Sequence, residues 1–212
     1  MPRNCSLRLF MLFAALGLGS ATATLAQSWP DKPIKLIVGF APGGFTDVLA
    51  RTIGQKLQDR LGQAVVVENK AGAAGTLGAD LVAKAKPDGY TLLLGHSNSN
   101  AVAPALYPKL PYDVVRDFSP IVRIASTPLL LTVHPGVAAT DVKSFIALAK
   151  SKPNGLAFAS SGSGSSQHMA AARFMLVTKT EMTHVPYKGS GQAIVDLLAG
   201  NVNLNFESPP NV

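Results

Sequence analysis

The chain has 212 residues, of which 47% are hydrophobic and 15% charged, and its formal net charge is +7. A basic balance raises the rate of encounter with anions but does not identify one. Lysine and arginine occur no denser than in pairs, and Trp29 is the only tryptophan. Because a nucleic-acid-binding surface would show a basic stripe with aromatic side chains, the composition favours solvated surface charge and argues against nucleic acid as a partner.

The first 26 residues are predicted to be a secretory signal peptide. Arg3 and Arg8 precede an apolar run over residues 9–19, and small residues follow up to Ala26. The run is well short of the roughly 20 residues that a membrane-spanning helix needs, so a signal peptide is preferred over a membrane anchor. Cleavage is expected near Ala26, with Ala23 as the alternative.

Cysteine usage supports an exported protein. Cys5 is the only cysteine and lies inside the predicted signal peptide. The mature chain is therefore expected to contain no disulfide and no cysteine metal site. Together with the signal peptide, this predicts a periplasmic protein.

Strands and helices alternate along the first half of the mature chain. Apolar residues predict a strand over 34–40 and, at helical spacing, a helix over 46–61 that ends at Gly62. Thr46 or Asp47 is the expected N-cap, because either side chain can accept from the open N–H groups. The next expected elements are a strand over 64–68, a helix to about 85, a strand over 91–95 and a short helix over 101–106.

A proline-rich stretch, residues 107–120, interrupts this pattern and predicts a crossing between two lobes. The alternation of strands and helices then resumes, and such alternation favours parallel sheets with helices covering both faces. Two α/β lobes are therefore predicted, over residues 27–118 and 119–206. The expected strands of the second lobe are 121–125, 129–134, 156–160, 182–187 and 202–206, and its expected helices are 141–150, 168–177 and 192–198.

Four glycine-rich turns follow predicted strands and precede predicted helices: "APGGFT", "NKAGAAG", "SSGSGSSQ" and "KGSGQ". In open α/β sheets, ligands bind at the carboxyl ends of strands, where glycine allows close backbone approach and helix N-termini offer free N–H donors. The turns therefore predict a site for a carboxylate or a phosphate. No dinucleotide-binding or P-loop motif is present, so no cofactor is expected.

The segment "GHSNS", residues 95–99, suggests an alternative, a secreted serine hydrolase. A nucleophile elbow would place Ser97 after a strand, with His168 or His184 as its base. Ser99 stands where the elbow needs glycine, so a polar loop lining a pocket explains the segment equally. The histidines show no metal-binding spacing, so no metal site is predicted.

Several stretches together resemble one family: "PIKLIVGFAPGGFTDVLAR", "VVVENKAGAAGTLGADLVAKAKPDGYTLLLG", "LPYDVVRDFSPI", "LAFASSGSGSSQHMAA" and "HVPYKGSGQAIVDLLAGNVNLNF". They are similar to the extracytoplasmic receptors of tripartite tricarboxylate transporters, the Bug family, over essentially the whole mature chain. The resemblance implies a two-lobed periplasmic binding protein of Venus-flytrap type with a ligand cleft between its lobes. It also implies a non-enzyme that binds a small organic acid, serves membrane transporter subunits and works as a monomer.

In that family, the loop after the first strand and the serine/glycine loop of the second lobe grip a carboxylate, through helix N-termini, hydroxyls and ordered water. The resemblance places ligand-binding residues in these two loops, in the "VPYKG" turn and after the last strand. They are Ala41, Gly43, Gly44, Phe45, Thr46, Asp47, Ser160, Ser161, Ser163, Ser165, Ser166, His168, Tyr187, Lys188, Gly189 and Glu207. For Asp47, a role as helix cap is the open alternative.

Three departures from the family pattern bear on this site. Phe45 stands where a small or polar residue is usual, which predicts a more apolar pocket floor, and Glu207 stands where Asp is common. Family members also continue for roughly a further hundred residues beyond Val212. Residues 207–212 are therefore expected to begin a crossing back to a first lobe whose C-terminal part is missing.

Overall fold

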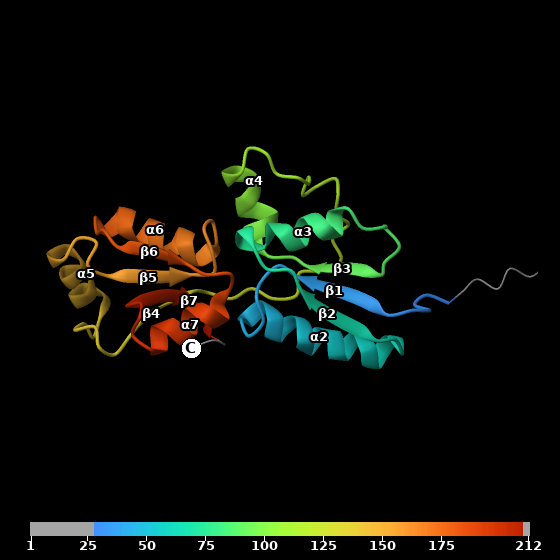
Figure 1. Ribbon diagram of the computed structural model, residues 1–212, viewed down its shortest axis with the longest axis horizontal. Helices are drawn as coiled ribbons and strands as arrows, with labels where there is room; N and C mark the ends of the chain where they lie inside the picture. Colours follow the sequence, from blue (N-terminus) through green and yellow to red (C-terminus); the bar gives the residue numbers. More distant parts are fainter. Residues whose placement is uncertain (1–27, 210–212) are drawn as a thin grey trace, which may run out of the picture. The chain divides into compact units, whose positions relative to one another are not determined.

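Two β-sheets, each flanked by helices, organise the chain in the computed structural model, which describes residues 28–209 (Figure 1). A short unit ends at Asp31, and everything described below belongs to the compact unit that begins at Lys32. The predicted α/β fold is confirmed. The predicted signal peptide lies outside the described residues, and none of the helices within them is long and apolar enough to cross a bilayer.

The first sheet has three parallel strands in the order β2-β1-β3, namely β2 (Val65–Asn69), β1 (Ile34–Val38) and β3 (Thr91–Leu94). Helices α2 (Phe45–Leu61) and α3 (Thr76–Ala83) lie on opposite faces of it (Figure 1). Leu36 and Val38 alternate onto the α2 face, where they form a core with Ala50. Helix α2 ends where the sequence predicts, because Gly62 adopts the left-handed conformation (φ 67°) that closes a helix.

The stretch between the two sheets is mostly irregular. A π-helical turn (Asn98–Val102) leads into the short helix α4 (Ala103–Leu106), whereas a short 3₁₀ turn (Ala73–Gly75) lies earlier, between β2 and α3 of the first sheet. The strand predicted over 121–125 is absent. Its apolar residues suggested a strand, but Ile121 and Val122 are more than 70% exposed, and a strand forms only where a neighbour completes its hydrogen-bond ladder.

The second sheet has the strand order β4-β7-β5-β6. Strand β5 (Ala157–Ser160) runs parallel to both β6 (Thr183–Pro186) and β7 (Leu204–Glu207), whereas β4 (Leu130–Val133) is antiparallel to β7. The expectation of parallel sheets is therefore wrong for β4, which enters from the irregular stretch and lacks the helical crossover that makes neighbouring strands parallel.

Three helices cover this second sheet: α5 (Val142–Ser151), α6 (Ser166–Thr178) and α7 (Ser190–Leu198). Phe158 and Leu204 share one face with Phe145 of α5 and Ala171 of α6. Ala159 lies on the opposite face with residues of α7. Each large apolar side chain buried in this way contributes about 1.5–3 kcal/mol, so the loops that follow the strands rest on a rigid base.

Candidate functional site

The loops that follow four parallel strands surround one hollow of about 230 Å³, which we call the glycine-loop hollow. Two of these loops come from the first sheet, after β1 and β2, and two from the second, after β5 and β6. The lining residues are Gly39, Phe40, Gly72, Ala73, Ala74, Gly75, Tyr107, Ser161, Gly162, Ser163, Tyr187 and Lys188.

Hydrogen bonds join the loops around this hollow. The Ala41 N–H donates to the Lys188 carbonyl (3.2 Å), and the Tyr107 hydroxyl donates to the Ser163 carbonyl (3.3 Å). Nearby, the fully buried Asn98 accepts the Ser166 N–H through Oδ1 (2.8 Å). Because these bonds use backbone groups, the loops approach one another closely.

Glycine is essential where the loops of the first sheet meet. A Cβ at Gly39 would lie 2.7 Å from both Cα and the carbonyl oxygen of Gly75, a distance that no real side chain tolerates against backbone. Gly75 itself has φ +94°, a conformation that favours glycine. The "NKAGAAG" turn therefore packs its backbone directly on the strand end that lines the hollow.

Helix N-termini give the hollow a positive potential. Residues 72–75 lead into α3 and residues 187–188 into α7, and both helices have glycine N-caps with no side-chain capping bond. In α3 the Thr76 N–H donates to the Ala73 carbonyl, whereas the other first-turn N–H groups of the two helices have no side-chain cap, and each terminus carries about half a positive charge. Lys188 adds a full positive charge at the rim.

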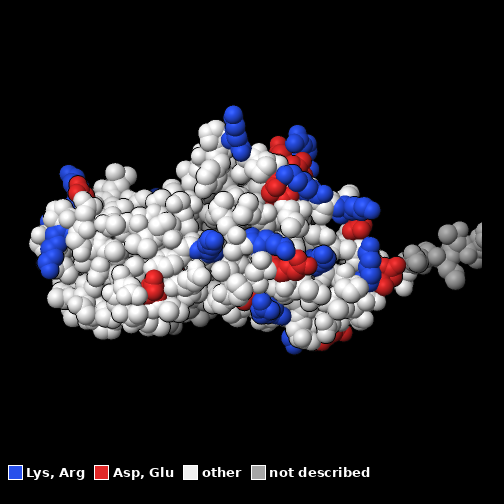
Figure 2. Space-filling model, viewed as in Figure 1, with Lys and Arg blue, Asp and Glu red and all other residues white. Residues whose placement is uncertain are grey.

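Surface charge elsewhere is mixed. Figure 2 shows Lys and Arg side chains lying beside Asp and Glu on the face that it presents, and ion pairs such as Lys35–Glu68 (3.5 Å) and Lys84–Asp80 (2.7 Å) account for part of this pattern. Exposed pairs of this kind are screened by solvent and salt. Attraction of an anion to the hollow therefore depends on the loops themselves.

Asp47 is part of the scaffold of the first loop. Its carboxylate accepts from the Gly43 N–H (3.1 Å), from Asn69 Nδ2 (2.9 Å) and from the Arg51 guanidinium (3.0 Å). Burial raises the pKa of Asp47, but these hydrogen bonds and the charge of Arg51 outweigh it and hold the pKa below its usual value. The N-cap of α2 is Gly44, so the prediction of Thr46 or Asp47 is wrong, because the Asp47 carboxylate reaches back to Gly43 instead.

Tyr187 lines the hollow, and its side chain packs against the apolar cluster that includes Ala159, Ala193 and Leu197. The hydroxyl donates to the Asp196 carboxylate on α7. Burial, together with this bond and the charge of Asp196, raises the pKa of Tyr187 to about 12. The Tyr187 hydroxyl is therefore held at α7.

Ser160 and His184 form a close pair, with 2.7 Å between Ser160 Oγ and His184 Nε2. The pair is not placed for nucleophilic catalysis, because Ser160 is fully buried and its hydroxyl also bonds Gly162. Within the described residues, no hydrogen bond joins Ser97 to His168 or His184, and the ring next to the Ser97 hydroxyl is that of His96 (3.4 Å). The predicted elbow is therefore not assembled.

The structure divides the sequence-predicted site residues into three groups. Ser161, Ser163, Tyr187 and Lys188 line the hollow, and Ala41 and Gly189 lie against each other beside it. Asp47, Ser160, Ser165 and His168 form internal bonds that shape the loops. The remaining residues are not among those lining the hollow: Gly43, Gly44, Phe45, Thr46, Ser166 and Glu207, the last of which accepts from Asn205 (3.1 Å) and the Ser208 N–H (2.8 Å).

Sequence reasoning missed several lining residues, namely Gly39, Phe40, residues 72–75 and Tyr107. The glycine pattern did mark the 72–75 turn, but that turn carries no polar side chain and was left out of the site. Phe40, and not Phe45, supplies the apolar ring at the hollow. No residues next to Tyr107 in the sequence mark it as a site residue, because only the folded chain brings it to the hollow.

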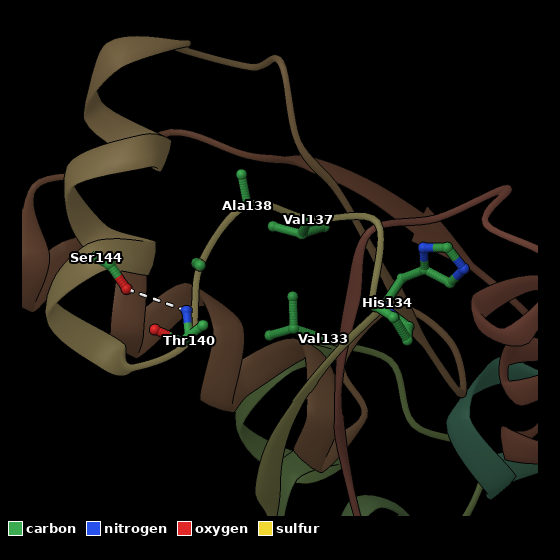
Figure 3. Close-up of a pocket in the computed structure, with 8 residues that line it drawn as sticks. Val133, His134, Val137, Ala138, Thr140 and Ser144 are labelled. Carbon is green, nitrogen blue, oxygen red and sulfur yellow. Dashed lines mark hydrogen bonds between the residues drawn. The ribbon is translucent and has the colours of Figure 1, made fainter.

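A second hollow, of about 500 Å³, lies around residues 133–140 and Ser144 (Figure 3). Val133 and Val137 point toward one another across it, and the Ser144 hydroxyl is bonded to the Thr140 N–H (3.3 Å). Val133 pairs with Leu204, the first residue of β7, so this hollow lies at the amino ends of the parallel strands, away from the glycine loops. Residues 28–209 contain no cluster of three or more His, Cys, Asp or Glu side chains that could hold a metal ion.

The fold is that of a known class of α/β proteins, because the periplasmic binding protein BugD superposes on it with a TM-score of 0.81 at 33% identity, covering 85% of this chain and 60% of that one. A family model described as "Tripartite tricarboxylate transporter family receptor" matches residues 49–212. Protein BugT of Bordetella pertussis is 43% identical over 207 residues, which cover 95% of this chain and 64% of BugT. This chain therefore belongs to the tripartite tricarboxylate transporter receptor family, as the sequence motifs predict.

Solved structures of the family agree with this assignment. An R. palustris protein solved with adipate superposes with a TM-score of 0.84 at 37% identity, covering 86% of this chain and 61% of that one. MatC from Rhodopseudomonas palustris, solved with bound malate, superposes with a TM-score of 0.82 at 35% identity, covering 86% and 62%. The chain thus spans less than two thirds of the length of the relatives that it matches.

Proposed function

We propose that this chain acts as an extracytoplasmic solute receptor, exported with cleavage near Ala26, that captures a small organic acid in the glycine-loop hollow. It then presents the acid to the membrane subunits of a tripartite tricarboxylate-type transporter. The observation that carries this proposal is the convergence of four strand-end loops, from two sheets, on one hollow of about 230 Å³.

The chemistry of the hollow supports a carboxylate. Open N–H groups at the starts of α3 and α7, the hydroxyl of Ser163 and the ammonium of Lys188 are all donors. Donors that hold an anion make shorter and stronger hydrogen bonds than they make to a neutral group. A carboxylate gains from all of them, whereas the corresponding amide brings donors of its own and no charge.

The size and the walls of the hollow support a small acid with an apolar body. About 230 Å³ is below the range of roughly 300–1,000 Å³ typical of drug-sized ligands. Phe40 and Ala74 contribute apolar parts of the wall. Dicarboxylates such as adipate and malate, the ligands of the two solved relatives, are of suitable size and are the first candidates.

A thermal-shift screen tests the proposal. The protein is heated with adipate, malate, citrate and benzoate, and with the amide of each acid at the same concentration. At least one acid should stabilise it, since a ligand at 100 times its Kd adds about 2.7 kcal/mol, and the amide should bind more weakly by about 2–4 kcal/mol. Equal stabilisation by acid and amide contradicts the proposed site.

Variants locate the effect. Lys188→Met removes the ammonium at the hollow and should weaken acid binding about tenfold, because a hydrogen bond to a charged group contributes about 1.5–3 kcal/mol. Lys150→Met, at the exposed end of α5, is the matched control and should have no effect. Ser97→Ala should leave binding unchanged, and a loss of ester hydrolysis in that variant would instead support the hydrolase.

A further inference from the structure

A cluster of three nearly parallel aromatic rings lies between the second sheet and helix α6, directly behind the serine/glycine loop. The His168 and His184 rings are stacked with centroids 4.1 Å apart and 5° between their planes. Phe158 of β5 lies beside this pair, with its centroid 4.8 Å from that of His184 and 6.2 Å from that of His168. Phe158 and His184 are also register partners in neighbouring strands, so the sheet fixes the position of the stack.

Both histidines are bonded to the loop that lines the hollow, residues 160–168. His168 Nδ1 accepts the Gly164 N–H (3.0 Å), and His184 Nε2 lies 2.7 Å from the Ser160 hydroxyl. The same hydroxyl bonds both the N–H and the carbonyl of Gly162. The loop between Ser160 and Gly164 is therefore held from behind by two imidazoles, while Ser161 and Ser163 face the hollow.

The bond to Gly164 requires a neutral imidazole. Nδ1 of His168 accepts, so the ring proton lies on Nε2. A second proton would put an N–H at Nδ1 against the Gly164 N–H and would turn an acceptor into a repelling donor. It would also place a positive charge about 4 Å from the stacked His184 ring.

The surroundings of the stack contain little else that titrates. β5 and the loop present uncharged groups, Phe158, Ser160 and Gly164. Phe206 of β7 belongs to the core that α6 covers, and Glu207, the next residue, points to the opposite face of the sheet. The Glu207 carboxylate therefore does not face the histidine pair. The charged side chains of the neighbouring helices and of the turn before β6 are exposed at the surface: Lys143, Lys150, Arg173, Lys179 and Glu181.

We propose that the stacked pair His168–His184 positions the 160–168 loop for the ligand, and that protonation of the pair in acid releases this loop and weakens capture. The pair acts through the loop, so both are positioning residues, and the link to capture rests on the proposed function. Neither ring lines the hollow, so a positive charge gained by the histidines attracts a bound carboxylate only from a distance. Loss of the bond to Gly164, by contrast, changes the position of the loop directly. Burial lowers the pKa of both rings, and burial with the charge of His168 lowers that of His184 to about 4, so the pair is neutral at neutral pH and titrates in acid.

Three variants separate this role from general stability. His168→Asn keeps an acceptor, since the amide oxygen takes the place of Nδ1, but it does not titrate. His168→Phe keeps a ring in the stack and removes the acceptor at every pH. His134→Asn is the matched control, because His134 Nδ1 also accepts a backbone N–H, that of Gly136 (3.0 Å), beside the other hollow.

The first measurement needs no ligand. Hydrogen exchange at the Gly164 amide is followed by NMR in the full chain from about pH 7 to about pH 4, a range that extends below the ordinary histidine pKa because burial lowers the pKa of both rings, and is corrected for intrinsic exchange. Protection should fall with pH in the wild type and in His134→Asn, stay constant in His168→Asn and be low throughout in His168→Phe. Constant protection in the wild type, or an equal fall in His168→Asn, overturns the proposal.

The second measurement is the Kd for adipate by calorimetry at the same pH values. Adipate itself titrates in this range, so the wild-type Kd is divided by the Kd of His168→Asn at each pH. This ratio should rise about fivefold from neutral to acid pH, which corresponds to the loss of about one hydrogen bond. A constant ratio overturns the link between loop and capture. If Gly164 responds as expected but neither adipate nor malate binds at any pH, the proposed function fails and the histidine-held loop stands.

Discussion

Replacing Asp47 with asparagine is expected to lower the free energy of unfolding by about 2–3 kcal/mol. The Asp47 side chain is 5% exposed, and every group bonded to it is a donor: the Gly43 N–H, Asn69 Nδ2 and the Arg51 guanidinium. An amide in its place turns an NH₂ group toward at least one of these donors, whichever way it is oriented. The substitution is thus nearly isosteric but leaves buried polar groups without partners.

The magnitude follows from counting what is lost. A buried donor left unsatisfied costs about 1–3 kcal/mol, and the amide oxygen retains part of the network. The ion pair adds less than about 1 kcal/mol, because the Arg51 side chain is 54% exposed and its charge is screened. Since Asn69 also donates to the Phe40 carbonyl (3.0 Å), the loop beside the hollow should loosen as well.

Urea denaturation followed by circular dichroism measures the loss. Asp80→Asn is the control, because Asp80 and Lys84 form the same i,i+4 pair on α3 with a more exposed carboxylate, and it should cost less than about 0.5 kcal/mol. The lowered pKa of Asp47 means that its contribution is present above the carboxyl's ordinary pKa and is lost as the pH falls through the folded value. Equal losses in the two variants at neutral pH, or a loss that persists unchanged in strong acid, would refute this account of the network.

Three further substitutions have defined outcomes. The folded state favours neutral His184, because its pKa is lowered, so the free energy of unfolding should fall by about 1–2 kcal/mol as the pH drops from about 6.5 to about 4. His184→Phe should flatten this dependence of stability on pH, measured by urea denaturation at several pH values. Tyr187→Phe loses the bond to Asp196 and should lower the free energy of unfolding by about 1 kcal/mol, measured by urea denaturation. The same variant should leave the adipate Kd, measured by calorimetry, within about twofold of the wild-type value. Gly39→Ala should cost about 1–3 kcal/mol, measured as a lower Tm, because its Cβ meets Gly75 backbone at 2.7 Å, whereas Gly44→Ala, with 3.5 Å to the nearest atom, should be mild.

The regular part of the fold could be predicted because its signals are local. The apolar spacing of α2 and the stop at Gly62 are written in adjacent residues, and both are confirmed. The segment 121–125 shows the limit of such signals, because its apolar residues meet no neighbouring strand. The strand β4 was predicted but its antiparallel direction was not, since that direction depends on its pairing with β7, about 70 residues away in sequence.

The candidate site could be predicted only where backbone chemistry is visible in the sequence. Glycine and serine after a strand marked Ser161 and Ser163, and both line the hollow. Tyr107 was invisible because it reaches the hollow from an irregular stretch, and the His168–His184 stack was invisible because it joins α6 to β6. Asp47 was also predicted for the site, and its bonds to Asn69 and Arg51, which shape the first loop, could not be read from the sequence.

The central claim is that a carboxylate binds in the glycine-loop hollow, and amide chemical-shift mapping with adipate, or with whichever acid the thermal-shift screen selects, tests it most directly. The account predicts the largest shifts at residues 72–75, at Ser161 and Ser163 and at Lys188, with saturation at one common Kd. The larger hollow at residues 133–140 serves as the internal control and should show no change. Shifts confined to residues 133–140, or equal shifts with the corresponding amide, would contradict the claim.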